Sequence, residues 1–216
     1  MSWYASQIIT SGNAGFVKTL QAVPAFKDRL FLLDEPIRKS WKAPEETYDV
    51  PADGLLFLRS ICDPTSHISE WFEEDEIIST NAFAELEGAD LAIDPRNLAQ
   101  YELKEEPPII PYLDALRFAK RLSQTTNTTV AYYYCYFWGG HPEVEFAWVF
   151  DDAERAFIRL VDPTPGANRL LAIGPTGAED LYEDVLVKTM AALGCHLPGP
   201  YFYPHTRSYA WEEHRL

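Results

Sequence analysis

Basic residues are scarce in this chain: 18 lysines and arginines stand against 33 aspartates and glutamates among 216 residues, and the formal net charge is −15. Binding to a nucleic-acid backbone needs clustered basic side chains that release counterions from phosphates, so the composition argues against nucleic acid as the main partner. It argues equally against an anionic membrane surface. Such a negative net charge attracts basic proteins, cationic ligands and metal ions. The alternative is that it only keeps the protein soluble.

Cysteine and long apolar runs are also scarce. The three cysteines, Cys62, Cys135 and Cys195, are odd in number and far apart, which is typical of reduced thiols and not of a disulfide framework. The first ten residues have neither the basic stretch nor the apolar run of a secretory signal. No window approaches the roughly 20 apolar residues of a membrane span. We therefore expect a soluble, cytoplasmic protein.

Motifs that identify a reaction are missing as well. The chain has no G-x-S-x-G elbow, no glycine-rich phosphate loop and no H-E-x-x-H pair. His196, His205 and His214 are spaced nine residues apart, whereas zinc sites use short paired spacings. Cys195 follows an expected helix C-terminus, where the dipole disfavours a thiolate. We expect no metal, no cofactor and, on balance, no enzyme.

Apolar and aromatic residues, by contrast, are plentiful. They make up 47% of the chain, and Phe, Tyr and Trp alone make up 14%, which is enough to bury a sizeable core and to exclude disorder as the main state. We find no internal repeat. The length fits one large domain, so we expect a single globular α+β domain over residues 1–216.

The strongest pattern predicts an antiparallel sheet. Thr128–Trp138 is apolar or tyrosine on both alternating faces, which is typical of a central strand covered on both sides. Gly139 and Gly140 form a turn, and the strands Glu143–Phe150 and Ala156–Val161 follow after short loops. The spacing predicts an antiparallel meander over about residues 128–161. We expect further strands at Trp3–Thr10, Leu55–Cys62 and Leu170–Ile173.

Two amphipathic helices are expected to pack on this sheet. The first covers about residues 111–124, with apolar residues at helical spacing and with Asp114 early and Lys120 late, as the helix macrodipole favours. The second covers about residues 177–193. Thr176 and Glu179 have the spacing of a capping box that would open this second helix.

The sequence also predicts a cap and a third helix. Gly194 is a suitable C-terminal cap for the second helix. Pro24 is suited to the first position of another helix, which would carry Phe26, Leu30 and Leu33 and end before Pro36.

A candidate catalytic or metal site lies at Trp138–Glu145. If a strand begins at the turn, His141, Glu143 and Glu145 alternate onto one face. One imidazole and two carboxylates could bind a divalent metal or perform acid–base chemistry. Pro142 interrupts the alternation, however, and polar residues beside a hairpin turn are equally typical of its solvated end.

A second candidate is an acidic stretch that could contact a partner. No lysine or arginine occurs between Arg59 and Arg96, while residues 63–94 hold ten carboxylates. Part of this stretch combines charge with an aromatic side chain, as partner-binding surfaces do: Glu70, Trp71, Glu73, Glu74, Asp75 and Glu76. The same residues also suit a solvated helix whose aromatic side faces the core, so both interpretations stay open.

Our leading functional hypothesis is an acidic bacterial protein that binds and neutralises a basic toxin or effector, in the manner of immunity proteins. It is based on the acidity, the reduced cysteines and the lack of catalytic motifs, and the comparison with immunity proteins is one of class. The alternative is a small hydrolytic or metal-assisted enzyme with its site around Trp138–Glu145. A structural subunit of a larger assembly is a third possibility, and the oligomeric state is not predicted.

Overall fold

A computed structural model of the chain describes residues 3–40, 43–59, 88–101, 113–138, 141–160, 169–206 and 209–216. The predicted partner-binding stretch from Glu70 to Glu76 lies outside the described residues. Among those that are described, no helix is both long enough and apolar enough to span a membrane.

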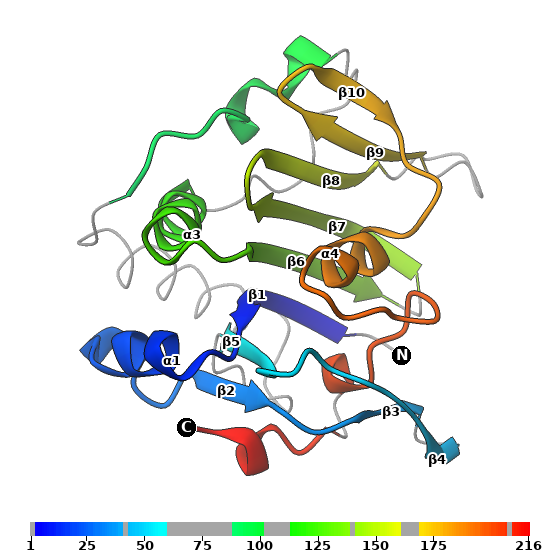
Figure 1. The fold of residues 1–216 in the computed structure, drawn as a ribbon. Coiled ribbons are helices and arrows are strands. Elements are labelled where there is room, and N and C mark those ends of the chain that lie inside the picture. The colour runs from blue at the N-terminus through cyan, green and yellow to red at the C-terminus, as the bar shows by residue number, and fades with distance from the viewer. Residues whose placement is uncertain are drawn as a thin grey trace.

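Ten strands and three α-helices form the described fold (Figure 1). The strands are β1 (Trp3–Ser11), β2 (Leu30–Leu33), β3 (Ile37–Ser40), β4 (Ala43–Tyr48), β5 (Leu55–Arg59), β6 (Val130–Trp138), β7 (His141–Phe150), β8 (Glu154–Leu160), β9 (Arg169–Gly174) and β10 (Gly177–Asp180). The helices are α1 (Ala14–Gln21), α3 (Leu113–Thr126) and α4 (Val185–Ala192). Short 3₁₀ turns cover Pro24–Phe26, Pro95–Tyr101, Tyr203–His205 and Trp211–His214.

Eight of the strands form one antiparallel sheet in the order β10-β9-β8-β7-β6-β1-β5-β2, and β3 pairs with β4 beside it. The predicted meander is confirmed as β6, β7 and β8, which continues into β9 and β10. The N-terminal strand β1 lies between β6 and β5, so it joins the meander to the strands of the first third of the chain. The protein therefore has the predicted α+β fold.

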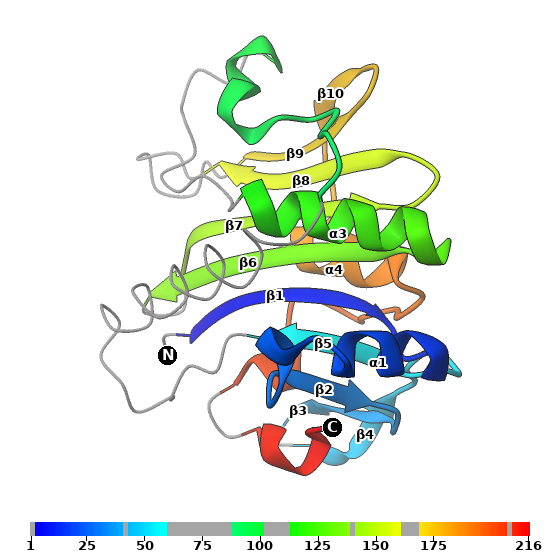
Figure 2. The same ribbon diagram turned by 90° about the vertical axis from the view of Figure 1, so that its left-hand side faces the viewer.

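Both faces of β6 are buried, as its sequence predicts. On one face, Tyr132 and Trp148 pack in a core that includes Leu116 and Phe118 of α3. On the other face, Tyr133 packs in a core that includes Met190 of α4. Figure 2 shows α3 in front of the sheet and α4 behind it. The predicted helix over residues 111–124 is thus confirmed as α3, within the part of that range that is described.

The aromatic C-terminal segment packs on the same face as α4. Phe202 and Trp211 are buried there, and each lies against the ring of Phe57 on β5, at centroid distances of 6.1 and 5.2 Å. The chain then covers the edge of the sheet at β2, because the backbone N–H of Leu216 donates to the carbonyl of Leu30 at 3.0 Å. The last residues of the chain therefore protect one of the two sheet edges.

The helix predicted from Pro24 to Leu33 is wrong. The chain makes a 3₁₀ turn over Pro24–Phe26, Asp28 takes a positive φ of 64°, and Leu30–Leu33 becomes strand β2. The positive φ breaks helical continuity, and pairing with β5 buries the apolar run more completely than one helix face would.

The helix predicted over residues 177–193 is wrong in its first half. Gly174 and Gly177 pair with each other and enclose the two-residue turn Pro175–Thr176, so that residues 177–180 form β10 and not a helix. Gly177 has a φ of 141°, which favours glycine and does not occur within a helix. The helix α4 begins only at Val185, and Gly194 follows it with a φ of 79°, in agreement with the predicted cap.

Candidate functional site

Glu145, one member of the predicted site, lies inside the protein. It is 2% exposed on β7, on the face of the sheet that α4 covers. The Tyr133 hydroxyl donates to its Oε1 at 2.9 Å, and the Arg159 Nε donates to its Oε2 at 2.8 Å. The strand register produces this arrangement, because Glu145 lies directly opposite Arg159 on β8. Glu145 is therefore part of a buried ion pair.

Arg159 connects this buried carboxylate to the surface. Its Nη2 donates to Oδ1 of Asp184 at 2.6 Å, and Asp184 is the N-cap residue of α4. The side chains of Glu145, Arg159 and Asp184 are 2%, 11% and 32% exposed, so the chain of charges runs outward from the core. We call Glu145, Arg159 and Asp184 the buried charge relay. The name describes how the three charged side chains run from the core to the surface, and it does not imply proton transfer.

Burial governs the electrostatics of these groups. Burial raises the pKa of the Glu145 carboxyl, against the lowering influence of the Arg159 charge and of the hydrogen bonds from Arg159 and Tyr133. Burial also holds the pKa of the Tyr133 hydroxyl well above its usual range, so this group stays a hydrogen-bond donor. The ion pair with Arg159 therefore stabilises the buried negative charge of Glu145.

The other two residues of the predicted site start the same strand. The β6–β7 register shifts so that Val144 pairs with Tyr136 while Pro142 pairs with Phe137, which leaves Glu143 as an extra residue on β7. The side chains of His141 and Glu143, like that of Trp138, lie outside what the structure describes. The trio therefore stays a prediction as a site. The contacts that the structure describes for it are those of Glu145 with Arg159 and Tyr133.

The sequence interpretation missed Tyr133, Arg159 and Asp184. A signal was present, because Glu145 and Arg159 carry opposite charges within two consecutive apolar strands. Charged residues inside such strands point to a buried pair when the register brings them together. The register that places Glu145 opposite Arg159 is that of β7 with β8, which the sequence pattern did not fix.

A second buried polar contact lies next to Tyr133 on the same face. The ring of His205 stacks on that of Tyr133, with centroids 5.4 Å apart, and its Nε2 lies 2.5 Å from the amide nitrogen of Gln7. Burial, together with the nearby Arg59 charge, lowers the pKa of His205 to about 3. His205 is therefore neutral at ordinary pH, and it fastens the C-terminal segment to the sheet.

The histidines do not form the zinc site that was considered in the sequence. His205 is buried, His196 is exposed, and His214 contacts the Tyr209 hydroxyl through Nε2 at 2.9 Å. Across the described ranges, no three His, Cys, Asp or Glu residues are grouped as metal ligands would be. Burial raises the pKa of Cys195 to about 11, as expected for an inert thiol.

The outer end of the buried charge relay is an exposed acidic loop, which we define as residues 179–184. Its carboxylates are those of Glu179, Asp180, Glu183 and Asp184. Tyr182, in the middle of the loop, is 94% exposed, which is far more than any other large hydrophobic residue described. Asp180 pairs with Arg169 at 2.7 Å and Glu183 with Lys188 at 2.6 Å, and both pairs lie at the surface.

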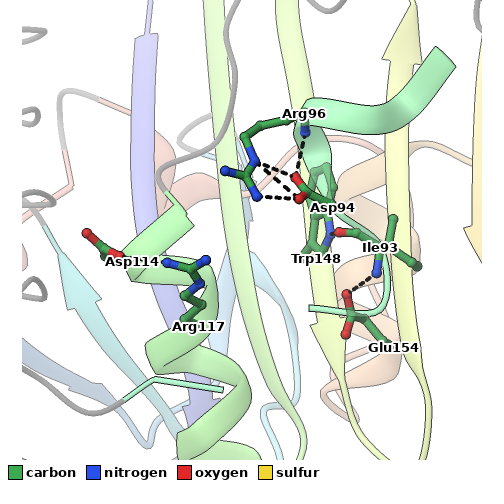
Figure 3. Close-up of polar contacts among 7 residues, drawn as sticks. All are labelled: Ile93, Asp94, Arg96, Asp114, Arg117, Trp148 and Glu154. Carbon is green, nitrogen blue, oxygen red and sulfur yellow. Dashed lines mark hydrogen bonds and ion pairs between the residues drawn. The ribbon is translucent and has the colours of Figure 1, made fainter. Parts of the chain in front are cut away.

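The described end of the acidic stretch 63–94 is fixed to the opposite face of the sheet (Figure 3). The Glu154 carboxylate accepts hydrogen bonds from the backbone N–H groups of Ala92 and Ile93, at 2.9 and 2.7 Å, and from Lys120 Nζ at 2.8 Å. The Trp148 indole donates to the Ile93 carbonyl at 3.1 Å. Within this stretch, Asp94 pairs with Arg96 at 2.6 Å, and the hydrogen bond from Arg96 lowers the Asp94 pKa.

Replacing Glu154 with glutamine is expected to loosen residues 88–101. The glutamine amide keeps one acceptor oxygen, so one of the two backbone N–H groups loses its hydrogen-bond acceptor. Lys120 loses its charged partner. Hydrogen bonds to a charged group contribute roughly 1.5–3 kcal/mol, and we expect a loss of about 2 kcal/mol in the free energy of unfolding. Faster amide exchange at Ala92 and Ile93 would show the loosening. Asp114→Asn, at an exposed ion pair with Arg117, is the control and should change little.

Comparisons of the chain with protein-family models, with curated proteins and with solved structures found no match.

Proposed function

We propose that this protein binds a basic partner protein through its acidic loop and thereby neutralises it, in the manner of a bacterial immunity protein. The observation that carries the proposal is Tyr182, a large side chain that is 94% exposed between two pairs of carboxylates. Tyrosine gives an interface a rigid, amphipathic anchor, and surrounding charges steer an oppositely charged partner toward it.

The buried charge relay supports this role by holding the loop in place. Asp184 ends the acidic loop, and its carboxylate is bound by Arg159, which Glu145 in turn holds from the core. A loop that is ordered before binding loses less conformational entropy in the complex. The net charge of −15 adds long-range attraction toward a basic protein.

The acidic stretch that includes Glu70, Trp71, Glu73, Glu74, Asp75 and Glu76 stays a second predicted contact surface for the same partner. If it takes part, neutralising Glu73, Glu74 and Glu76 together slows association. The enzyme alternative gains no support from Glu145, since that carboxylate is engaged by Arg159.

Replacing Tyr182 with alanine is expected to weaken partner binding by 10-fold or more, because truncation of a central aromatic anchor removes about 2 kcal/mol. The folded state should keep its stability, since the side chain is exposed. The partner is isolated by pull-down from the source cell with the full chain at low salt, and its affinity is then measured for each variant. Tyr201→Ala, a partly exposed tyrosine in the C-terminal segment, is the matched control.

Charge is tested separately with Glu179→Gln/Glu183→Gln. We expect a slower association rate and a weaker dependence of that rate on salt, while Glu45→Gln/Glu46→Gln on β4 leaves both unchanged. The proposal is wrong if no stoichiometric partner is recovered at low salt. It is also wrong if the recovered partner binds the Tyr182 and Glu179/Glu183 variants as tightly as it binds the original protein.

A further inference from the structure

The acidic loop begins in strand β10, which forms one edge of the sheet (Figure 1). The N–H of Leu181 donates to the carbonyl of Leu170 at 2.8 Å, so residues 181, 179 and 177 face β9 with their backbone groups. In an antiparallel ladder the alternate residues face away from the partner strand. The N–H and C=O groups of Ala178 and Asp180 therefore point outward, and all four β10 residues are exposed.

The two edges of the sheet differ in whether another segment of the described chain pairs with the edge strand. At β2, the C-terminal residues of the chain supply a partner, through Leu216 to Leu30 and through the bridge between Phe31 and Arg215. At β10, no strand among the described residues occupies the outer side. An uncovered edge is a template for pairing with another chain.

A hollow of about 400 Å³ lies beside this edge, between the β9–β10 hairpin and α4. Phe157 and Ala172 contribute apolar surface to it, and Glu179, Arg155 and Lys188 line it with charge. A Cβ atom added at Gly174 or Gly177 would meet no atom within 4 Å, so the glycines leave this space open. Every second side chain of a strand placed along β10 would extend toward this face of the sheet.

The charges on the edge indicate which chain can occupy it. Two copies of this protein paired antiparallel through β10 would bring their Glu179 and Asp180 side chains close together, and like charges in such positions are destabilising. A segment with basic side chains would instead meet the Glu179 carboxylate, while Asp180 is already paired with Arg169 at 2.7 Å. The occupant that fits is therefore a basic extended segment and not a second copy.

We propose that the basic partner adds an extended segment to the outer edge of β10, with backbone hydrogen bonds to Ala178 and Asp180. Alternate side chains of that segment enter the hollow over Phe157 and Ala172 or pair with Glu179. This inference rests on the proposed function, and it specifies how the partner is recognised: through the main chain by the edge, and through basic side chains by the acidic loop.

The first test uses an octapeptide of alternating lysine and valine as the probe. Amide hydrogen exchange is measured at Ala178 and Asp180, which should exchange rapidly in the free protein, and at Glu179 and Leu181, which should not. We expect the peptide to slow exchange at Ala178 and Asp180 by 10-fold or more. The same peptide with N-methyl groups on alternate residues carries equal charge but lacks the backbone donors, so it should give no protection.

The second test uses two variants of the full chain. Ala178→Pro removes an outward N–H without removing a β9–β10 hydrogen bond, and Gly174→Leu fills the hollow. Each should weaken binding of the peptide by 10-fold or more. Gly199→Leu, at another open position, is the control for the second. Unchanged slow exchange at Glu179 and Leu181 would show that the hairpin of each variant remains folded.

The outcomes separate this inference from the proposed function. If Tyr182→Ala weakens binding of the isolated partner but Ala178→Pro does not, the partner-binding function stands and strand addition is overturned. Equal protection by the plain and the N-methylated peptide, or none by either, also overturns strand addition. If the isolated partner is insensitive to the acidic-loop variants, the proposed function fails, and this inference fails with it.

Discussion

Replacing Arg159 with methionine is expected to lower the free energy of unfolding by about 3–5 kcal/mol, because the change leaves a buried carboxylate without its counter-ion. Glu145 is 2% exposed, and its remaining described partner would be the Tyr133 hydroxyl. Methionine has a similar length and fills the space, so the loss reports charge and not a cavity. Chemical denaturation at neutral pH measures it.

A control of the same residue type is available at the surface. Arg169 pairs with Asp180 at 2.7 Å, close to the 2.8 Å of Arg159 with Glu145, but its side chain is 60% exposed and not 11%. Arg169→Met should therefore cost at most about 1 kcal/mol. If the two arginine variants lose the same stability, burial is not what gives the inner ion pair its importance.

A double variant tests whether the loss comes from the uncompensated charge. Glu145→Gln removes the charge and keeps an oxygen for the Tyr133 hydroxyl, so Glu145→Gln/Arg159→Met should recover most of the stability that Arg159→Met loses. The Arg159→Met loss should also shrink in mild acid. Since burial raises the Glu145 pKa, protonation then removes the buried charge while the protein is still folded.

The same substitution is expected to affect the acidic loop. Without Arg159, the carboxylate of Asp184 loses the hydrogen bond that holds the end of the loop beside the sheet. Amide exchange across residues 181–186 should then increase more than exchange in α3, on the opposite face. An acidic loop that exchanges as slowly as before would show that its order does not depend on the buried charge relay.

The sequence predicted the meander and α3 because their patterns are local. In β6, apolar and tyrosine side chains occupy both alternating faces, which already indicates two covering layers. The position of β1 was not predictable in the same way. Its pairing with β5 joins residues more than 40 positions apart, and its pairing with β6 joins residues more than a hundred positions apart. Strand propensity carries no information on such partners.

The wrong helix at residues 24–33 and the wrong first half of the helix at residues 177–193 have a common cause. In each place a local helix signal competed with strand pairing. Pro24 suits a helix start, yet Leu30–Leu33 pairs with β5. Thr176 and Glu179 have capping-box spacing, yet Pro175 and Thr176 form the turn of a hairpin and Gly177 begins β10. In both places a glycine or a positive φ near the junction decided the outcome.

The candidate site was predictable only in part. The sequence pattern selected Glu145 but assigned it to a rim beside His141, whereas the register places its carboxylate in the core against Arg159. The acidic loop escaped notice because the capping-box interpretation put Glu179 and Tyr182 on a helix. Once β10 is a strand, the same residues become an exposed edge and loop.

Acidic pH is expected to destabilise the protein because protonation of His205 is unfavourable in the folded state. A variant without this histidine tests the cause. Burial and the Arg59 charge lower the pKa of His205 to about 3, while an unfolded histidine has a pKa near 6.5. A histidine whose folded pKa is depressed contributes stability above the unfolded pKa, and that stability is lost as pH falls from about 6.5 toward 3. Each pH unit in this window costs about 1.4 kcal/mol, or nearly 3 kcal/mol by about pH 4.5.

The geometry explains why protonation is so unfavourable. His205 lies between the rings of Tyr133 and Phe202, at centroid distances of 5.4 and 4.8 Å, and its Nε2 faces the amide nitrogen of Gln7. A second ring proton would place two donors against each other there and a charge in an apolar layer. Arg59, which lies over the Trp211 ring at 3.8 Å, adds repulsion.

His205→Gln should therefore abolish this part of the pH dependence while it keeps a polar contact with Gln7. Unfolding free energies at about pH 7.5 and 4.5 are compared for the original protein and the variant, so that carboxylates common to both cancel. We expect the original protein to lose nearly 3 kcal/mol more than the variant over this range. His196→Gln, at an exposed histidine, should behave like the original protein. Equal losses in the original protein and in His205→Gln would show that His205 is not held neutral by its burial, and that the C-terminal segment is not attached to the sheet through an acid-sensitive contact.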